Sequence, residues 1–418
     1  MHPVASHSIR HLIALALALL LTAGLAGTAS AAGQGSITYV KDNDIWLTNP
    51  DGTGRFRVTW DGTADSPYRS PSQADNGTIA AGHLNDIVVM KQNGEVIRKI
   101  DPPALVNSAS HPMDGAPVDV AISPNARIIA WSFVGYECDP TVSCGTRTAT
   151  GYTDASGRTP VSKYGSTFLY DPSWVGNTRT IQSGGYGSQV MLHDIGQQPV
   201  HWFDDDDYAE NSTDLSDSEL SPDGRRVASV RGYGSNTQVF TYDVTGNAKT
   251  GPAPAVPSPK CGTSTEEGIA GPTWAPDSDR LAWQNSEGIW TGNMSDCENA
   301  GLKLVVPGGT EPDWGPARID PSPGGIRLPF NSLRRALKKG LAIDFISIGK
   351  GRVEFTVKLG RRVIAADHGT APNGGPLRAV LKIRRSARKR LAGMKKASLT
   401  ISLTQKGKTA YGKGLLRK

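Results

Sequence analysis

The sequence predicts an all-β protein in which a six-bladed β-propeller is followed by a small β-sandwich. Its 418 residues include 48 Gly and 28 Pro, with only 20% charged residues. This composition is typical of many short strands joined by turns. One sequence motif, a turn followed by a strand, recurs at about the length of a propeller blade. Residues 319–418 then change to longer alternating strands with a strongly basic composition.

The repeated phrase is a turn rich in Ser, Pro, Asp and Gly, followed by an apolar strand. A third strand with alternating apolar and polar residues follows, as in TQVFTYDVTGN, so each unit predicts a four-stranded meander. The anchor residues are 46 to 54 positions apart. The copies are SPSQADNGTIAAG, AISPNARIIAWSF, PSWVGNTRTIQSG, ELSPDGRRVASV and TWAPDSDRLAWQ, with anchors Ile79, Ile129, Ile181, Val227 and Leu281.

The two ends of the repeat region each lack part of a blade. GSITYVKDNDIWLTNPDGTGRFRVTW, from Gly35, has strands without an opening turn, whereas TEPDWGP, from Thr310, is an opening turn without strands. We expect the two pieces to share a sixth blade, which would close the ring without leaving exposed sheet edges.

The phrases SPDGRRVASV, WAPDSDRLAW and NDIWLTNPDGTGRFRVT resemble the WD-repeat-like blades of the TolB-type six-bladed propeller family. The resemblance covers residues 35–316 and implies a propeller domain at residues 33–317. Members of this family include binding partners and the non-catalytic domains of peptidases, so the resemblance predicts a fold and leaves the function open.

The N-terminus predicts export. Arg10 precedes the apolar run LIALALALLL, and Ala29, Ala31 and Ala32 offer a small-residue cleavage site. We expect residues 1–32 to be a cleaved signal peptide of a secreted or surface-associated protein. The alternative is a retained anchor, although the run is shorter than the ~20 residues that span a bilayer.

Four cysteines in an exported chain favour disulfides, and local pairing is the simplest arrangement. Cys138 and Cys144 bracket a short loop, and Cys261 and Cys297 flank one repeat. The first pair belongs to a polar insertion between Tyr136 and Tyr164, which is either a binding loop or surface decoration.

A Pro/Gly-rich linker at residues 318–326 separates the propeller from a domain at residues 327–418. Alternating stretches such as RVEFTVKLG and ASLTISLTQ predict a small sandwich. Two helical pieces interrupt them, with Gly340 as a C-cap and Ser386 as an N-cap. The pattern resembles immunoglobulin-like modules at the C-termini of exported bacterial proteins.

Charge divides the chain into an acidic body and a basic tail. Residues 319–418 contain 24 Lys and Arg against 4 Asp and Glu, leaving 21 against 35 in the rest. The basic surface could hold anionic cell-envelope polymers or lipid headgroups, dock on the acidic propeller, or remain solvated. Nucleic acid is not expected, because the basic stretches lack interleaved aromatic residues.

No catalytic, cofactor-binding or metal-binding residue is predicted. GYGSQ and GYGSN lack the second Gly of a serine-hydrolase elbow. The acidic run Asp204, Asp205, Asp206 and Asp207 lacks calcium-loop spacing and is interpreted as a solvated loop, with a cation as the alternative. The recurring Trp residues and the histidines His83, His193 and His201 are interpreted as structural.

These observations favour a non-catalytic, monomeric binding or scaffold protein that uses a propeller face to recognise a protein or a cell-envelope polymer. The basic domain would attach it. One alternative is a propeller-based hydrolase or lyase, which would need carboxylates or a metal converging on the axis. Another is a purely structural envelope protein.

Overall fold

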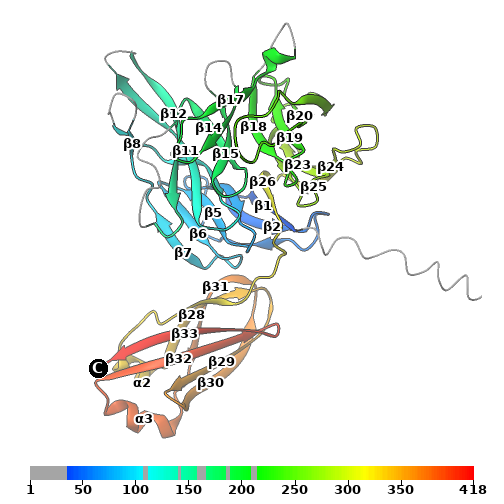
Figure 1. Ribbon diagram of the computed structural model, residues 1–418. Coiled ribbons are helices and arrows are strands. Elements are labelled where there is room, and N and C mark those ends of the chain that lie inside the picture. Colours follow the sequence, from blue (N-terminus) through cyan, green and yellow to red (C-terminus); the bar gives the residue numbers. More distant parts are fainter. Residues whose placement is uncertain (1–34, 107–111, 140–142, 158–165, 185–188, 209–213) are drawn as a thin grey trace, which may run out of the picture.

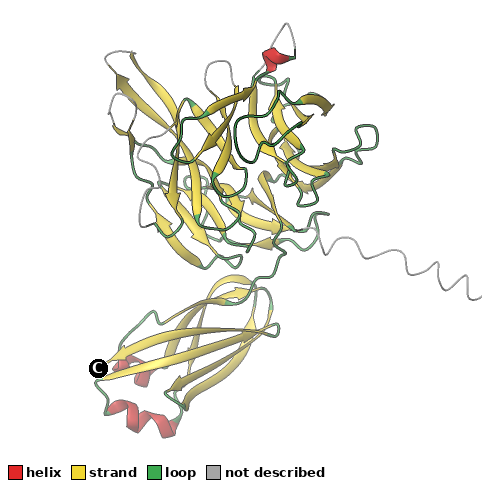
Figure 2. Cartoon of the chain, in the orientation of Figure 1, coloured by secondary structure: helices red, strands yellow, loops and turns green. Residues whose placement is uncertain are grey.

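The computed structural model describes residues 35–106, 112–139, 143–157, 166–184, 189–208 and 214–418. The predicted signal peptide, with Ala29, Ala31 and Ala32, lies outside these residues. The described chain is all-β with two short α-helices, and it forms a β-propeller-like domain and a second, smaller domain (Figures 1 and 2). Among the described helices, none is long and apolar enough to cross a membrane.

The propeller-like domain contains six four-stranded antiparallel sheets, which we number 1 to 6 along the chain. Sheet 1 is β4 (Tyr68–Gln73), β5 (Ile79–His83), β6 (Asp86–Met90) and β7 (Val96–Ile100). Sheet 2 is β10 (Pro117–Ile122), β11 (Ile128–Asp139), β12 (Ser143–Asp154) and β13 (Ser166–Thr167). Sheet 3 is β14 (Leu169–Trp174), β15 (Arg179–Gly184), β16 (Gln189–Asp194) and β17 (Val200–Phe203).

Sheets 4 to 6 follow the same plan, except that the last one joins both ends of the region. Sheet 4 is β18 (Leu215–Leu220), β19 (Arg226–Arg231), β20 (Gln238–Asp243) and β21 (Ser258–Gly262). Sheet 5 is β22 (Ala270–Trp274), β23 (Arg280–Asn285), β24 (Gly288–Asn293) and β25 (Lys303–Pro307). Sheet 6 is β26 (Thr310–Gly315), β1 (Ser36–Lys41), β2 (Asp44–Thr48) and β3 (Phe56–Arg57). The prediction that both ends share one sheet is confirmed.

The first strands of the sheets, which we call the inner strands, form a closed ring. β4 contacts β10, and the contacts continue through β14, β18, β22 and β26 back to β4. β26 pairs antiparallel with β1, with Ile37 opposite Trp314, so the ring closes by strand pairing rather than by a covalent link. This pairing covers the edge of β1 that would otherwise be open to another chain.

The core of this domain is divided into clusters between neighbouring sheets. The five predicted anchors lie in the second strands and are fully buried. In β5, Ile79 and Ala81 pack toward sheet 6, whereas Ala80 between them packs toward sheet 2. Successive side chains of a strand point to opposite faces, so each sheet supplies one apolar face to each neighbour.

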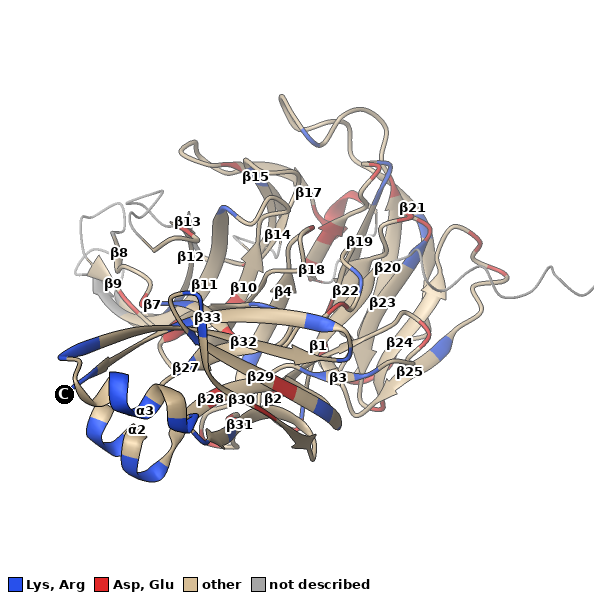
Figure 3. Cartoon of the chain, turned by 90° about the horizontal axis from the view of Figure 1, so that it is seen from below, with Lys and Arg blue, Asp and Glu red and all other residues tan. Residues whose placement is uncertain are grey.

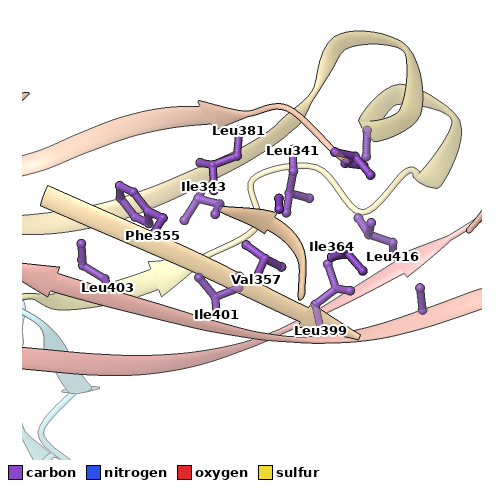
Figure 4. Packing of buried hydrophobic residues seen from close by; sticks show 14 of the residues in the cluster. Leu341, Ile343, Phe355, Val357, Ile364, Leu381, Leu399, Ile401, Leu403 and Leu416 are labelled. Carbon is purple, nitrogen blue, oxygen red and sulfur yellow. The ribbon is translucent and has the colours of Figure 1, made fainter. Parts of the chain in front are cut away.

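The second domain has two antiparallel sheets that enclose one core. One sheet has the order β27 (Gly324–Arg327), β28 (Leu341–Ile348) and β31 (Gly374–Leu381). The other has the order β30 (Arg362–Ala371), β29 (Gly351–Leu359), β32 (Lys396–Gln405) and β33 (Lys408–Arg417). Residues from both sheets, such as Ile343 and Leu381 from one and Val357 and Ile401 from the other, meet in this core (Figure 4).

Two helices close the end of this core that lies away from the propeller-like domain (Figure 1). In α2 (Leu333–Lys339), Ser332 caps the N-terminus by accepting the Arg335 N–H, and Gly340 at φ 94° is the C-cap, as predicted. In α3 (Arg385–Ala392), the predicted N-cap Ser386 is wrong, because the cap is Arg384. The Arg384 N–H donates to the Ile364 carbonyl of β30, which fixes where the helix begins.

Polar contacts hold the linker against the turn between β6 and β7. Gln92 donates its side-chain N–H to the Arg318 carbonyl at 2.9 Å and accepts the Asp320 N–H at 2.8 Å. Asn93 donates to the Ser322 carbonyl at 2.7 Å. The Trp60 indole lies against Gly375, where a Cβ would come within 2.7 Å of the ring. The two domains therefore meet through Trp60 and the linker, with the basic helices at the far end.

Candidate functional site

A cavity of about 470 Å³ lies where the six inner strands meet. Seven carboxyl side chains line it, and the described residues around it include no Lys, Arg, His or Cys. Asp75 lies in the turn after β4, and the other six belong to inner strands: Asp119, Asp171, Asp217, Glu219, Glu311 and Asp313. This is the only place in the described chain where we find carboxyl groups converging on the axis, so we take it as the candidate site.

The six inner-strand carboxyl groups occupy two equivalent positions of the repeat, counted from the turn that ends each inner strand. Four residues before the turn lies the bulge ring: Ser70, Asp119, Asp171, Asp217, Gly271 and Glu311. Two residues before the turn lies the second ring: Ser72, Ala121, Ser173, Glu219, Thr273 and Asp313. Equivalent strands thus deliver equivalent side chains to one axis.

A β-bulge turns the bulge ring toward the cavity. Strand pairing shifts register in all six inner strands, for example between Ser216 and Glu219. At that bulge Asp217 has φ 44°, and Asp171 and Glu311 have φ 48° and 52°. Residues other than Gly rarely adopt this left-handed backbone conformation, because it is strained. The conformation persists only where surrounding contacts hold it. A bulge re-aims the side chain that follows it.

Second-ring side chains join neighbouring sheets at four of the six junctions. Glu219 accepts the Trp274 N–H at 2.8 Å, and Asp313 accepts the Gln73 N–H at 2.6 Å. Ser72 and Thr273 make the same bond, accepting the Ile122 and Trp314 N–H groups at 3.1 and 3.0 Å. The bond from Asp313 to Gln73 spans the closure of the ring. These polar groups therefore hold sheets together as well as lining the cavity.

The bulge ring makes a second set of bonds between sheets. Asp217 accepts the Gly271 N–H at 2.9 Å, and Ser70 accepts the Val120 N–H at 2.9 Å. Glu311 accepts the Ser70 N–H, and Asp119 and Asp171 are hydrogen-bonded to each other. Each group thus serves the same structural purpose at its own junction.

Burial raises the pKa values of five of the inner-strand carboxyl groups. It raises the pKa of Glu219 to about 8, with the Asp313 charge adding to the rise, and that of Asp313 to about 6. Burial also raises the pKa values of Asp119 and Glu311, and it raises that of Asp171 well above its usual range, with the charges of Asp217 and Asp119 adding to this rise. Each side chain touches the cavity on one side only, so the ionised form is poorly solvated.

The arrangement can accept protons or positive charge. No basic group or thiol of the described lining stands beside a carboxyl group to act as nucleophile or base. Within the described residues, no group of three or more His, Cys, Asp or Glu side chains is arranged to hold a metal ion. A positively charged group entering the cavity would favour the ionised carboxylates and release protons.

The predicted acidic run is part of the fold. Asp205 is buried and forms an ion pair with Arg231, whose guanidinium donates to it at 2.7 and 3.2 Å. It begins the short helix η2 (Asp205–Asp207), and Asp204 lies 3.3 Å from His201. The interpretation as a simple solvated loop is therefore wrong for Asp205, because an arginine brings that carboxylate into the protein.

The predicted disulfide between Cys261 and Cys297 is present. Cys144 is also disulfide-bonded, and backbone pairing places it opposite Cys138 in the hairpin of β11 and β12. This hairpin extends beyond its sheet (Figure 1). In the described residues 136–139 and 143–154, the insertion is thus a projecting two-stranded arm.

None of the three predicted histidines lines the candidate cavity, whereas Trp174 and Trp314 do. His193 is buried among Tyr152, Gln182 and the Gln197 carbonyl, and burial lowers its pKa. His83 stacks on Tyr68 with ring centroids 4.1 Å apart. Most of the tryptophans are buried between sheets. Trp174 and Trp274 donate their indole N–H to the Ala121 and Glu219 carbonyls of the preceding sheet, at 2.8 and 3.1 Å.

The sequence contained one signal for the axial residues. Pro follows the bulge-ring residue in four repeats, at Pro71, Pro172, Pro272 and Pro312. Counting four and two positions back from each turn therefore finds both rings. Strand alternation alone could not, because the bulge interrupts the period of two.

No protein-family model and no curated protein sequence matches the chain. Among solved structures, it is similar to the putative TolB from Agrobacterium tumefaciens, with 14% identity, a TM-score of 0.43 and coverage of 66% of this chain and 91% of that one. It is also similar to a functionally unknown protein from Desulfotomaculum acetoxidans, with 9% identity, a TM-score of 0.38 and coverage of 65% and 99%. Hsv2 from Kluyveromyces lactis matches with 10% identity, a TM-score of 0.39 and coverage of 84% and 96%.

Proposed function

We propose that this chain is an exported, non-catalytic binding protein. A six-bladed, TolB-type propeller recognises a protein or another macromolecular partner, and an immunoglobulin-like C-terminal domain attaches it to the cell envelope. The observation that carries this proposal is that the axial carboxyl groups serve as hydrogen-bond acceptors between sheets. A rigid ring that uses its acidic groups in this way is suited to presenting a surface.

The arm of β11 and β12 is the part of that surface that we assign to recognition. Tyr136 is 74% exposed, and Val134 and Phe168 are also exposed nearby in the same sheet. The Arg147 guanidinium lies over the Phe168 ring, 5.4 Å from its centroid. Exposed aromatic groups next to an arginine are characteristic of protein-binding surfaces.

Capture from a cell-envelope extract tests the proposal. We expect the full chain and a chain ending at residue 317 to capture the same partner. A variant in which residues 136–146 are replaced by Asn-Gly should lose it, because Gly135 and Arg147 are paired and a two-residue turn can close the shortened hairpin. Capture that survives this trimming would exclude the arm, and capture that needs residues 318–418 would exclude the propeller as the recognition domain.

A propeller-based hydrolase or lyase is the second candidate, because carboxyl groups with different pKa values do meet on the axis. Glu219 near 8 and Asp313 near 6 could act as general acid and general base. Cleavage of envelope polysaccharides by the wild-type chain that disappears in Glu219→Gln would favour this function. Unchanged partner capture by a folded Glu219→Gln variant, without such cleavage, would support binding.

A further inference from the structure

The end of the C-terminal domain farthest from the propeller carries a concentration of positive charge, which we call the basic pole. Lys and Arg residues occupy much of α2 and α3 there (Figure 3). The pole consists of six runs of adjacent basic residues: 334–335, 338–339, 384–385, 388–390, 395–396 and 417–418.

These runs come from distant parts of the sequence and are joined by direct contacts. The Arg388 guanidinium of α3 donates to the Leu337 carbonyl of α2 at 2.6 Å. The Lys418 N–H donates to the Lys395 carbonyl at 3.1 Å, and the Arg417 N–H donates to the Asn331 carbonyl at 2.7 Å. The two helices, the turn after α3 and the C-terminal strand therefore form one surface.

The charge of the pole is not neutralised by the described protein. Every side chain in the six runs is exposed, and the segments that carry them contain no Asp or Glu. Acidic residues of this domain pair elsewhere: Asp344 binds Arg378 at 2.6 Å, and Glu354 binds Arg352 at 2.8 Å. The pole is thus left to interact with groups outside the molecule.

Several of these charges oppose the stability of the helices that carry them. Arg334 and Lys338, like Arg385 and Lys389, are four residues apart, where like charges on a helix repel. The first turn of each helix has arginines and no acidic residue, opposite to what the helix dipole favours. Stability alone does not account for this pattern, whereas a bound polyanion would relieve the repulsion.

We propose that the basic pole binds a linear, phosphate-bearing polymer of the cell envelope. This deepens the proposed attachment role and rests on it. Basic side chains four residues apart on a helix lie about 6 Å apart, so they can contact successive anionic groups of an extended polymer. Paired arginines add bidentate contacts to phosphate.

The surroundings of the pole favour such a polymer over a bilayer or a nucleic acid. Leu333 and Leu391 are buried in the domain core, and the exposed faces of both helices carry no large apolar side chain for insertion into a membrane. The aromatic residue beside α2, Phe330, is 37% exposed, and the Arg335 guanidinium lies over its ring, 3.6 Å from the centroid, where a base would stack.

Titration of the full chain with linear inorganic polyphosphate tests this assignment. We expect binding whose logarithm falls linearly with the logarithm of salt concentration. The pole variant Lys338→Gln, Lys339→Gln, Arg385→Gln and Lys389→Gln should bind more than about tenfold more weakly, with a shallower salt slope. The control variant Lys99→Gln, Arg127→Gln, Lys350→Gln and Lys413→Gln has the same net charge and exposed sites elsewhere, and should bind like wild type.

Equal weakening in both variants would overturn the proposal, because net charge rather than the pole would then bind. Two further results would also overturn it: capture by phosphatidylglycerol vesicles without polyphosphate binding, and tighter binding of single-stranded DNA than of polyphosphate. Circular dichroism of both variants separates weak binding from misfolding. Partner capture by a chain ending at residue 317 does not involve the pole, so failure here is distinct from failure of propeller recognition.

Discussion

Glu219 and Trp274 bind each other twice across the junction of sheets 4 and 5. The Glu219 carboxylate accepts the Trp274 N–H at 2.8 Å, and the Trp274 indole returns a hydrogen bond to the Glu219 carbonyl at 3.1 Å. The same side chain lines the axial cavity. One residue therefore connects the packing of the ring with the ionisation of its centre.

The raised pKa of Glu219 predicts that stability falls with increasing pH. The unfolded side chain loses its proton near 4.5, whereas the folded one retains it until about 8. Between these two pH values the free energy of unfolding falls as the pH rises, by at most about 1.4 kcal/mol for each pH unit. Glu219→Gln lacks this pH-dependent loss. The difference in the free energy of unfolding, variant minus wild type, should therefore increase as the pH rises from 4.5 to 8. Urea denaturation across this range measures the difference.

Glu298→Gln is the matched control, since it removes an exposed carboxyl group of the same type. Its unfolding free energy should follow wild type at each pH. If Glu219→Gln also runs parallel to wild type, the carboxyl group is not held protonated on the axis.

Removing the Cys261–Cys297 disulfide should destabilise the propeller-like domain. The bond joins β21 to the segment after β24 and closes a loop of 36 residues. Loop-closure entropy predicts that the double variant Cys261→Ser, Cys297→Ser has a free energy of unfolding about 4 kcal/mol lower than wild type. Thermal melting of this variant, compared with Cys138→Ser and Cys144→Ser, measures it. The second pair spans a much shorter loop, so an equal or greater loss there would contradict the entropic explanation.

Replacing Trp60 by Ala should loosen the junction between the domains. The indole packs against Gly375 and also lies under the Arg57 guanidinium, 4.4 Å from the ring centroid. Without it, the linker should be cleaved faster by a protease while both domains stay folded. Tyr233→Ala removes a 55% exposed aromatic residue between β19 and β20 and serves as the control. Similar cleavage rates in the two variants would show that the linker contacts of Gln92 and Asn93 suffice.

The strand framework could be predicted because it depends on local patterns. The anchor residues follow a turn, lie in short apolar strands and are fully buried, as at Ile79 and Val227. The joining of β26 to β1 could be inferred from two incomplete repeats. The start of α3 could not, because it depends on a hydrogen bond from Arg384 to the distant Ile364.

The candidate site was harder to predict, because its residues act through neighbours in other sheets. Asp313 contacts Gln73 across 240 positions of sequence, and no local pattern marks that pairing. Left-handed backbone at Asp171, Asp217 and Glu311 also departs from strand geometry. The raised pKa values come from the packing of several sheets around one axis, which single repeats do not contain.

The pairing of β26 with β1, which closes the ring, gives a last prediction about folding. A chain ending at residue 317 keeps β26, the bond from Asp313 to Gln73 and the bond from the Ser36 hydroxyl to the Ala317 carbonyl at 2.7 Å. A chain ending at residue 309 loses all three and leaves the edge of β1 exposed. We expect the longer chain to be monomeric with a cooperative thermal transition, and the shorter chain to aggregate, because an unpaired strand edge recruits other chains. Size-exclusion chromatography and circular dichroism distinguish these outcomes. Identical elution and melting of the two chains would mean that β26 contributes little to closing the ring.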